Sequence, residues 1–415
     1  MKIRALTGFI DPDWPIRPDR IGAIGACLKD AKEVLEEADY EVQTIRLAIP
    51  PPSEMSSSVA PEDMVDFAKK LEAECFVHNI DYAALGPALP NDMGGYEVIP
   101  AILRRTEVIF ASGLFADPTS GLSLPAARAC AYVIHEASTI MSDGFANLRF
   151  AALANVASGS PFFPAAYHRG GPPAMAIATE AADLAVSAVE DASTIPLATQ
   201  LMVEAIEGHA AVLSRKVQPI AWKHDVRFLG IDFSLAPYPE KARSLGTAIQ
   251  AMGVPTAGLA GSTMVSAFLA DCLDQAQFQR TGFCGLFFPV LEDSMLAASA
   301  ADGQLSLNDL LLYATVCGTG LDTIPLPGDI SPAEINAILV DLGALALRHD
   351  KQLTARLMPI PEKAPGDEIH FDFPYFADSC VLSLKAEPLK GHLGGDETID
   401  IRPRPTVDAK PPVNR

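Results

Sequence analysis

The spacing of hydrophobic residues changes twice within the first fifty positions. Residues 3–9 form a short apolar run that predicts a strand, and apolar side chains then recur at helical spacing over 19–38. Over 45–49 apolar and polar residues alternate, as they do in a strand. The chain is therefore predicted to begin as strand, helix, strand.

The same alternation of elements continues along most of the chain. Further strands are predicted at 104–111, 226–233, 284–290, 352–358 and 368–375. Further helices are predicted at 124–141, 145–156, 174–192, 195–216, 240–252, 261–276, 306–316 and 332–348. Strands that alternate with helices indicate an α/β fold with a largely parallel sheet.

The domain organisation follows from where this pattern stops. No linker interrupts residues 1–384, so they are predicted to form one large domain. Residues 385–415 carry few apolar side chains and several prolines, with one alternating piece at 398–402. This tail is predicted to be an extended or partly disordered C-terminal arm. The arm needs a surface to order against, and a second subunit is one candidate, so we expect a homodimer.

Polar residues share one face of three late strands. Asp232 and Ser234 lie on the same face, Arg356 lies on the polar face of a later strand, and His370 and Asp372 share a face of the last. A parallel sheet covered by helices normally has two apolar faces. These polar faces therefore line a cavity, a solvent edge or an interface. We favour a cavity; the alternative for His370 and Asp372 is an exposed edge strand.

Residues 316–329 combine a thiol, two hydroxyls, two carboxylates and three glycines. The segment has little apolar surface to bury, and its composition predicts a polar loop that holds a ligand. Cys317, Thr319, Asp322 and Asp329 are its candidate site residues. The alternative is an ordinary connection, because most loops rich in glycine and proline are only that.

Two further segments bring candidate side chains. Asn155 ends a predicted helix, and an aromatic, proline-rich loop then leads to His168. Glu292 and Asp293 follow the predicted strand 284–290, and the carboxyl ends of parallel strands are where α/β proteins bind ligands. In the alternative interpretations His168 is a structural histidine, and Glu292 or Asp293 caps the next helix.

Composition excludes several classes of function. The net charge of −21 and the absence of a Lys/Arg-rich run argue against nucleic-acid and anionic-membrane partners. No signal peptide, membrane-spanning run or phosphate-binding glycine loop is present, and neither a nucleotide nor a flavin is expected. The seven cysteines are scattered without a CxxC pair, which excludes a zinc cluster or disulfide framework and predicts a cytoplasmic protein.

Taken together, these segments resemble a family of bacterial and archaeal proteins known as domain of unknown function 711. The resemblance covers nearly all of residues 1–384 and rests on Asn155, Pro161, His168, the segment 231–237, Pro289, Glu292, Asp293, Cys317, Gly320, Leu321, Asp322, Asp329 and Arg356. It implies a barrel similar to that of pyruvate formate-lyase, with ten strands in two antiparallel halves of parallel strands, ringed by helices. It implies no reaction, because the family has none to carry over.

The chain departs from the glycyl-radical enzymes that share this barrel. It has no Arg-Val-Ser/Ala-Gly-Tyr/Phe signature near its C-terminus and no adjacent pair of cysteines. Glycyl-radical chemistry is therefore not expected. A branch of the resembled family has glycine-rich repeats after the histidine. Here a helix is predicted instead, so no role is carried over to Glu180.

Two classes of function remain. The first is a cytoplasmic hydrolase or lyase that acts on a small oxygenated or anionic metabolite by acid–base or metal-assisted chemistry. The second is a non-catalytic metabolite-binding or scaffold protein. Several titratable groups on separate segments favour the enzyme. If the cavity exists, Asp232, Arg356 and Cys317 should converge on it.

The candidate residues divide by chemistry. The catalytic candidates are Cys317, His168, Asp232 and Asp322, of which Cys317 or His168 would be the nucleophile or base. The substrate-binding candidates are Arg356, as an anion clamp, with Ser234, Asn155, His370, Asp372 and Thr319. Asp232, Glu292, Asp293 and Asp329 are hard oxygen ligands suited to Mg²⁺, Mn²⁺ or Ca²⁺.

Overall fold

Strands and helices alternate through most of the chain, as the hydrophobic pattern predicts. A computed structural model describes residues 1–404. The strands are β1 (Lys2–Phe9), β2 (Ile45–Ala48), β3 (Tyr82–Ala84), β4 (Ile109–Asp117), β5 (Gly121–Ser123), β6 (Phe150–Ala154), β7 (Ala174–Glu180), β8 (Arg227–Asp232), β9 (Gly320–Pro327), β10 (Leu353–Ile360), β11 (Glu368–Ile369), β12 (Ser379–Cys380) and β13 (Thr398–Ile399). The helices are α1 (Pro18–Glu36), α2 (Met64–Val77), α3 (Met93–Arg105), α4 (Leu124–Ser138), α5 (Ala182–Glu190), α6 (Ile195–Lys223), α7 (Leu245–Ala251), α8 (Ser262–Gln275), α9 (Ser294–Ala301), α10 (Leu307–Ala314) and α11 (Pro332–His349).

One large sheet holds most of these strands, in the order β8-β7-β1-β2-β3-β4-β6-β10-β9. β1, β2, β3, β4 and β6 run parallel to one another. At one edge of this block β7 pairs antiparallel with β1, and β8 runs parallel to β7. At the other edge β10 pairs antiparallel with β6, and β9 runs parallel to β10. The prediction of a mixed α/β fold with a mostly parallel sheet is confirmed.

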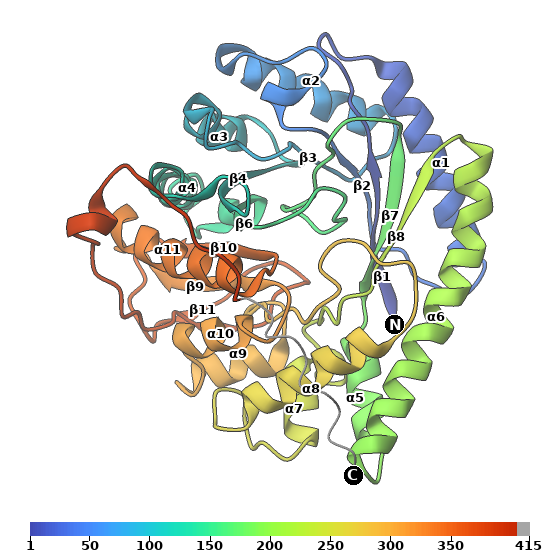
Figure 1. The fold of residues 1–415 in the computed structure, drawn as a ribbon, viewed down its shortest axis with the longest axis vertical. Coiled ribbons are helices and arrows are strands. Elements are labelled where there is room, and N and C mark those ends of the chain that lie inside the picture. The colour runs from blue at the N-terminus through green and yellow to red at the C-terminus, as the bar shows by residue number, and fades with distance from the viewer. Residues whose placement is uncertain (405–415) are drawn as a thin grey trace.

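Helices lie around the outside of the strands, and the strands occupy the middle of the molecule (Figure 1). The main hydrophobic core fills the space between the strands and these helices. A second cluster combines alanines of β2, β3 and β7 and the rings of Phe9 and Phe110 from β1 and β4 with Phe163 and Ala166 from the segment before β7. Strands β7, β9 and β10 are buried at every residue, as expected for strands covered on both faces.

Two of the predicted helices are instead strands. The segment 145–156 contains a short 3₁₀ turn followed by β6, and 174–192 divides into β7 and α5. Both strands are rich in alanine, which favours helices in isolation. In the folded chain they lie between neighbouring strands, where little room remains for larger side chains. Position in the sheet therefore overrides helix propensity.

Three other predicted elements also differ. The polar loop predicted at 316–329 is largely strand β9, which contains Gly320, Asp322 and Thr323. The strand predicted at 368–375 ends at Ile369, and Arg104 and Arg105 end helix α3 instead of starting a strand. The helix predicted at 332–348 is found as α11, and Ser331 and Glu334 form a reciprocal capping box at its start.

The segment 280–289 lies between β8 and β9 without forming a regular strand. Three single parallel bridges attach it, and they join Ile231 to Arg280, Leu235 to Leu286 and Pro289 to Asp322. Cys284 has a positive φ of 43°, and Pro289 has no backbone N–H to donate to a ladder. These local features explain why the strand predicted at 284–290 is interrupted.

The C-terminal arm lies against its own chain over the described residues. β13 pairs with β5, Arg128 forms an ion pair with Asp396, and Arg348 Nη1 donates to the carbonyl of Arg402 at 2.9 Å. Residues 385–404 thus pack on their own chain, with a short 3₁₀ turn at Gly391–Gly394, while 405–415 lie outside the described residues, and the arm at 385–415 stays a prediction. Since the arm finds its surface within the same chain, the homodimer loses that argument and stays a prediction.

Two further features of the described chain are its lack of membrane-spanning helices and the state of its cysteines. Among the helices in residues 1–404, none combines the length and apolarity needed to cross a bilayer. The seven cysteines all fall within this range and all are free thiols.

Asp232 fastens the segment 280–289 to the end of β8. Its carboxylate accepts hydrogen bonds from Ser234 Oγ at 2.6 Å and from the backbone N–H groups of Phe283 and Cys284 at 2.7 and 2.8 Å. The side chain is fully buried, so all three donors depend on it.

We predict that Asp232→Asn lowers the free energy of unfolding by about 1–3 kcal/mol, because the new amide N–H₂ faces a backbone donor. Urea denaturation measures the effect. The matched control is Asp372→Asn, at an exposed position, which should stay within about 0.5 kcal/mol of the wild type. Equal unfolding midpoints for the two variants would contradict the structural role of Asp232.

Candidate functional site

One cavity lies inside the molecule, between the starts of β1 to β4 and the strands β9 and β10. Its volume is about 100 Å³. A buried water needs roughly 10–15 Å³ by the same measure, so the space corresponds to several water positions, enough for a small metabolite. The lining residues are Arg4, Gln43, Thr44, Arg46, Tyr82, Phe110, Leu148, Phe162, Phe163, Ala236, Pro237, Phe287, Pro289, Glu292, Asp322, Arg356, Phe373 and Tyr375.

Six charged side chains, four of which line the cavity, form a row of alternating sign. In order the row is Arg243, Glu180, Arg4, Glu292, Arg356 and Asp322. Glu292 is the central link, because one of its oxygens pairs with Arg4 and the other with Arg356, the latter at 2.7 Å. Asp322 ends the row at 2.5 Å from Arg356 Nε. Every charge in the row therefore has a partner of opposite sign, as buried charges require.

A β-bulge lies beside the last ion pair. Two residues of β9, Asp322 and Thr323, stand opposite the single residue Arg356 of β10, and the register shifts between Ala355 and Leu357. Thr323 takes a positive φ of 42° at this point. Bulges re-aim side chains, and this one accompanies the placement of Asp322 and Arg356 side by side on the cavity wall.

Burial and neighbouring charge set the protonation of this pair. Burial acts to lower the pKa of Arg356, but the carboxylates of Asp322 and Glu292 outweigh it, so the pKa lies above its usual value. Burial raises the pKa of Asp322, and Glu292 adds to the rise although Arg356 opposes it. Asp322 is thus easier to protonate than an ordinary aspartate.

Asp322 also has one carboxylate oxygen to spare. Oδ1 accepts from Arg356 Nε, while Oδ2 accepts no hydrogen bond from any of residues 1–404. Since Asp322 lines the cavity, this oxygen is the acceptor that a ligand can reach. A carboxylate with a raised pKa and a free oxygen suits proton transfer.

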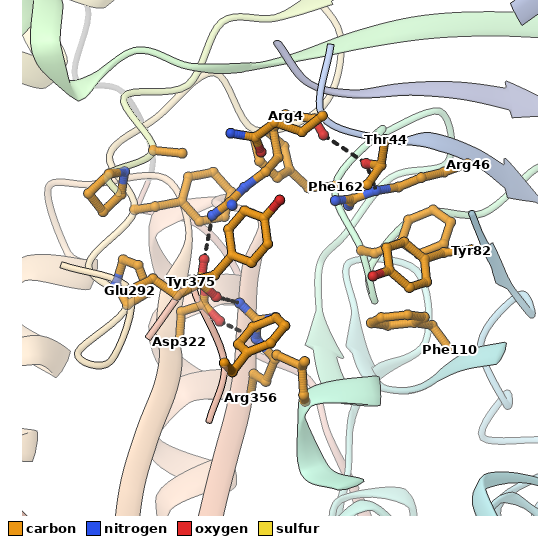
Figure 2. Close-up of a pocket in the computed structure, with 18 residues that line it drawn as sticks. Arg4, Thr44, Arg46, Tyr82, Phe110, Phe162, Glu292, Asp322, Arg356 and Tyr375 are labelled. Carbon is orange, nitrogen blue, oxygen red and sulfur yellow. Dashed lines mark hydrogen bonds and ion pairs between the residues drawn. The ribbon is translucent and has the colours of Figure 1, made fainter. Parts of the chain in front are cut away.

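Arg46 is the cavity arginine that stands outside the ion-pair row. Its Nε donates to Thr44 Oγ1 at 2.8 Å, and its guanidinium lies 5.1 Å from the ring centre of Phe163 and 5.8 Å from that of Tyr82. Within residues 1–404 no carboxylate pairs with it. Burial, with Arg4 nearby, lowers the pKa of Arg46 to about 10. Figure 2 shows Arg46 across the cavity from Glu292, Asp322 and Arg356. An unneutralised guanidinium in this setting is a binding group for an anion.

Aromatic rings make most of the remaining wall. Tyr82 and Phe163 each stand edge-on to Phe110, with ring centres 5.3 and 5.4 Å away. On another side Tyr375 lies 5.5 Å from the Arg4 guanidinium (Figure 2). A cavity with apolar walls and a few charged groups is the usual form of a small-molecule site.

Three of the residues proposed from the sequence line this cavity: Glu292, Asp322 and Arg356. The expected convergence of Asp232 and Cys317 with Arg356 is not found. Asp232 is absent from the lining and is held by the hydrogen bonds that attach 280–289, with Ser234 as one donor. Burial raises the pKa of Asp232 to about 6, although these hydrogen bonds oppose the shift.

Cys317 and Thr319 are buried just before β9 and lie outside the cavity lining. Burial raises the pKa of the Cys317 thiol, although backbone N–H groups of Thr319 and Gly320 oppose the shift. Thr319 Oγ1 donates to the carbonyl of Leu286 at 2.7 Å. Both residues therefore fit a packing and bonding role in the sheet better than a reactive one.

His168 and Asn155 also lie away from the cavity lining. The His168 backbone N–H donates to the carbonyl of Ile49 at 3.1 Å, and its buried ring lies 6.4 Å from that of Phe9. Burial lowers the pKa of His168. Asn155 Nδ2 donates to Asp350 Oδ1 at 3.2 Å. These contacts match the structural alternative for His168.

His370 and Asp372 are exposed, as in their alternative interpretation. His370 Nδ1 lies 2.6 Å from Asp378 Oδ1 on the surface. The opposite set of side chains in the same segment reaches the cavity, where Phe373 and Tyr375 form part of the wall. The segment does reach the cavity, but through its aromatic side chains, while its polar side chains point to solvent.

The four proposed metal ligands do not come together. Asp293 caps α9, where its carboxylate accepts from the backbone N–H groups of Met295 and Leu296 at 3.0 Å, and Asp329 is exposed in the turn before α11. In the part of the chain that the structure describes, no three His, Cys, Asp or Glu residues are grouped so that they could hold a metal ion. Binding of Mg²⁺, Mn²⁺ or Ca²⁺ stays a prediction without a ligand set.

Four charged residues of the cavity and its ion-pair row were missed by sequence reasoning: Arg4, Arg46, Glu180 and Arg243. The signal for Arg46 was present, because Thr44 and Arg46 alternate with apolar residues around the predicted strand 45–49. Glu180 was set aside because a helix was expected there, whereas it ends strand β7 and pairs with Arg4 at 3.3 Å.

We predict that Cys317 reacts with iodoacetamide only after denaturation, because its thiol is buried with a raised pKa. The half-buried Cys380 should be modified first in the native protein. Peptide mass spectrometry over a labelling time course measures both, and Cys380→Ser removes the fast signal as a control. Native labelling of Cys317 ahead of Cys380 would restore it as a candidate nucleophile.

Comparisons with known proteins agree on one family. The family model described as Uncharacterised ACR (DUF711) matches residues 1–378. A UPF0210 protein of Pyrobaculum arsenaticum is 28% identical over 393 residues, which cover 88% of this chain and 87% of that protein. A UPF0210 protein of Methanococcoides burtonii is 30% identical over 367 residues, which cover 82% of this chain and 80% of that protein. The match spans most of the chain, as the resemblance of its segments predicted, and the protein belongs to the Uncharacterised ACR (DUF711) family.

Proposed function

We propose that the protein is an enzyme that binds a small carboxylate in the central cavity and acts on it by acid–base chemistry. The observation that carries this proposal is Arg46, a cavity arginine with no carboxylate partner among residues 1–404. A guanidinium presents a planar fork that matches a carboxylate. The carboxylate of the substrate would supply the negative charge that no residue among 1–404 supplies to Arg46.

The charge balance of the cavity supports an anionic substrate. Its lining contains three arginines, Arg4, Arg46 and Arg356, against two carboxylates, Glu292 and Asp322. The difference is 3 − 2, or one positive charge. Water inside a cavity with aromatic walls screens such a charge poorly, so an anion is strongly favoured there.

Asp322 is the residue best placed to move a proton. Glu292 has both oxygens engaged by arginines, whereas Asp322 keeps one oxygen free towards the cavity. Its raised pKa brings it closer to the pH at which an acid–base catalyst works. Arg356 would then hold Asp322 in position and stabilise its ionised form. This assignment suits a lyase or hydrolase reaction and needs no glycyl radical.

We also propose that the strands form the ten-stranded arrangement implied by the resemblance to the pyruvate formate-lyase fold. The parallel block β1, β2, β3, β4 and β6 would be one half, and β7, β8, segment 280–289, β9 and β10 the other, five in each. The three bridges of segment 280–289 support this arrangement. The cavity would then occupy its interior.

A non-catalytic binding protein is the second candidate. The specific observation in its favour is that four of the cavity's five charged groups are held in ion pairs, so little reactive capacity remains free. In that case the same cavity would sense a metabolite. Ligand turnover separates the two functions.

We predict that Arg46→Gln weakens binding of small carboxylates about tenfold or more, because a charge-assisted contact is lost. Titration calorimetry with hexanoate and benzoate measures the dissociation constants. The control is Arg227→Gln, at an exposed position on β8, which should bind as the wild type does. Equal affinities in the Arg46 variant would overturn the anion site.

We predict that Asp322→Asn retains carboxylate binding but slows turnover about 100-fold or more, because the variant cannot exchange a proton. Incubation with a mixture of small carboxylic acids in D₂O, followed by mass spectrometry, detects deuterium uptake or new products. If the wild type binds acids through Arg46 and changes none of them, the non-catalytic alternative holds.

A further inference from the structure

The two ends of the cavity present different hydrogen-bonding groups to a ligand. Arg46 offers a guanidinium fork on one side, and the free oxygen of Asp322 offers an acceptor on the other (Figure 2). Glu292, on the same side of the cavity as Asp322, has no oxygen to spare. A ligand that satisfies both ends needs an anionic group at one position and a hydrogen-bond donor at another.

We propose that the substrate is a hydroxy acid with a single negative charge, whose carboxylate pairs with Arg46 and whose hydroxyl donates to the free oxygen of Asp322. This inference rests on the proposed function and specifies its substrate class. It assigns Asp322 a recognition contact as well as a proton-transfer role, because the same oxygen meets the hydroxyl proton.

Charge selects the hydroxyl over other donors. The ion-pair row together with Arg46 contains four arginines and three carboxylates, which leaves one positive charge. A hydroxy acid carries one negative charge and balances it. An amino acid is a zwitterion without net charge and leaves the positive charge in place, and a dicarboxylate brings a second anion against Asp322.

The walls between the two ends match the hydrocarbon part of such a molecule. The Phe163 ring lies next to Arg46 and packs against Phe110. Phe373 and Tyr375, from the segment after β10, line the cavity as well. Ring faces and edges pack against methylene groups without asking for further hydrogen bonds. The hydrocarbon part of the ligand would pack against these rings, while its carboxylate meets Arg46 and its hydroxyl meets Asp322.

A matched set of six-carbon compounds tests the inference: hexanoate, 2-hydroxyhexanoate, 6-hydroxyhexanoate, 2-aminohexanoate and adipate. Titration calorimetry on the full chain gives the dissociation constant of each. One of the two hydroxy acids should bind about tenfold or more tightly than hexanoate, because it adds a hydrogen bond to a charged acceptor. The amino acid and the dicarboxylate should bind more weakly than that hydroxy acid.

Two variants separate the contacts. In Asp322→Asn the preference for the hydroxy acid over hexanoate should shrink to about threefold or less, while hexanoate itself binds at least as tightly as before, because the variant removes a negative charge from the cavity. In Arg46→Gln all the acids should weaken together. A single cooperative thermal unfolding transition for each variant shows that the fold is retained. Asp322→Glu, which keeps the carboxylate and moves it by one methylene, provides a second variant if Asp322→Asn does not fold, and it too should change the preference for the hydroxy acid over hexanoate.

The outcomes distinguish this inference from the proposed function. If the acids bind through Arg46 but hexanoate binds as tightly as both hydroxy acids, the substrate class is wrong and the anion site stands. If 2-aminohexanoate or adipate binds most tightly, the charge argument is wrong. If none of the five compounds binds the wild type at millimolar concentration, both the inference and the anion site are overturned.

Discussion

The site depends on Glu292, the carboxylate that joins Arg4 of the first strand to Arg356 of the last long one. Burying these charges gains little stability by itself, because desolvation offsets most of their attraction. Removal of one partner is a different matter, since it leaves a buried charge without compensation and costs about 3–5 kcal/mol. The pairing therefore acts mainly as a constraint that holds distant segments in one arrangement.

Arg46 has no ion-pair partner in that arrangement over residues 1–404. The row uses equal numbers of arginines and carboxylates, so its own charges cancel, and the arginine on β2 adds to a neutral frame. Two aromatic rings and a threonine hydroxyl hold Arg46 in place without neutralising it. A cation kept in position but unpaired is the feature that gives the cavity a chemical preference, and the aromatic walls strengthen it by limiting solvent.

Sequence reasoning was most accurate where a side chain's partner lies nearby in the chain. The helix predicted at 332–348 is confirmed as α11, whose capping box joins Ser331 and Glu334, only three positions apart. Glu292 was found from the end of a predicted strand, Asp322 from a predicted polar loop and Arg356 from the polar face of a strand. The last two of these patterns also selected Cys317 and Asp232, yet these residues stabilise the sheet. The Cys317 thiol is buried outside the cavity, and the Asp232 carboxylate accepts three hydrogen bonds.

The sequence by itself determined the α/β class, the single large domain, the family and three of the cavity's charged residues. It misassigned β6 and β7, because alanine favours helices unless strands on either side decide otherwise. Only the tertiary structure decided which side chains of segment 368–375 point inward. Phe373 and Tyr375 line the cavity, whereas His370 and Asp372 are exposed to solvent. The physical reason is that alternation divides a strand into two faces but does not say which face the rest of the chain will cover.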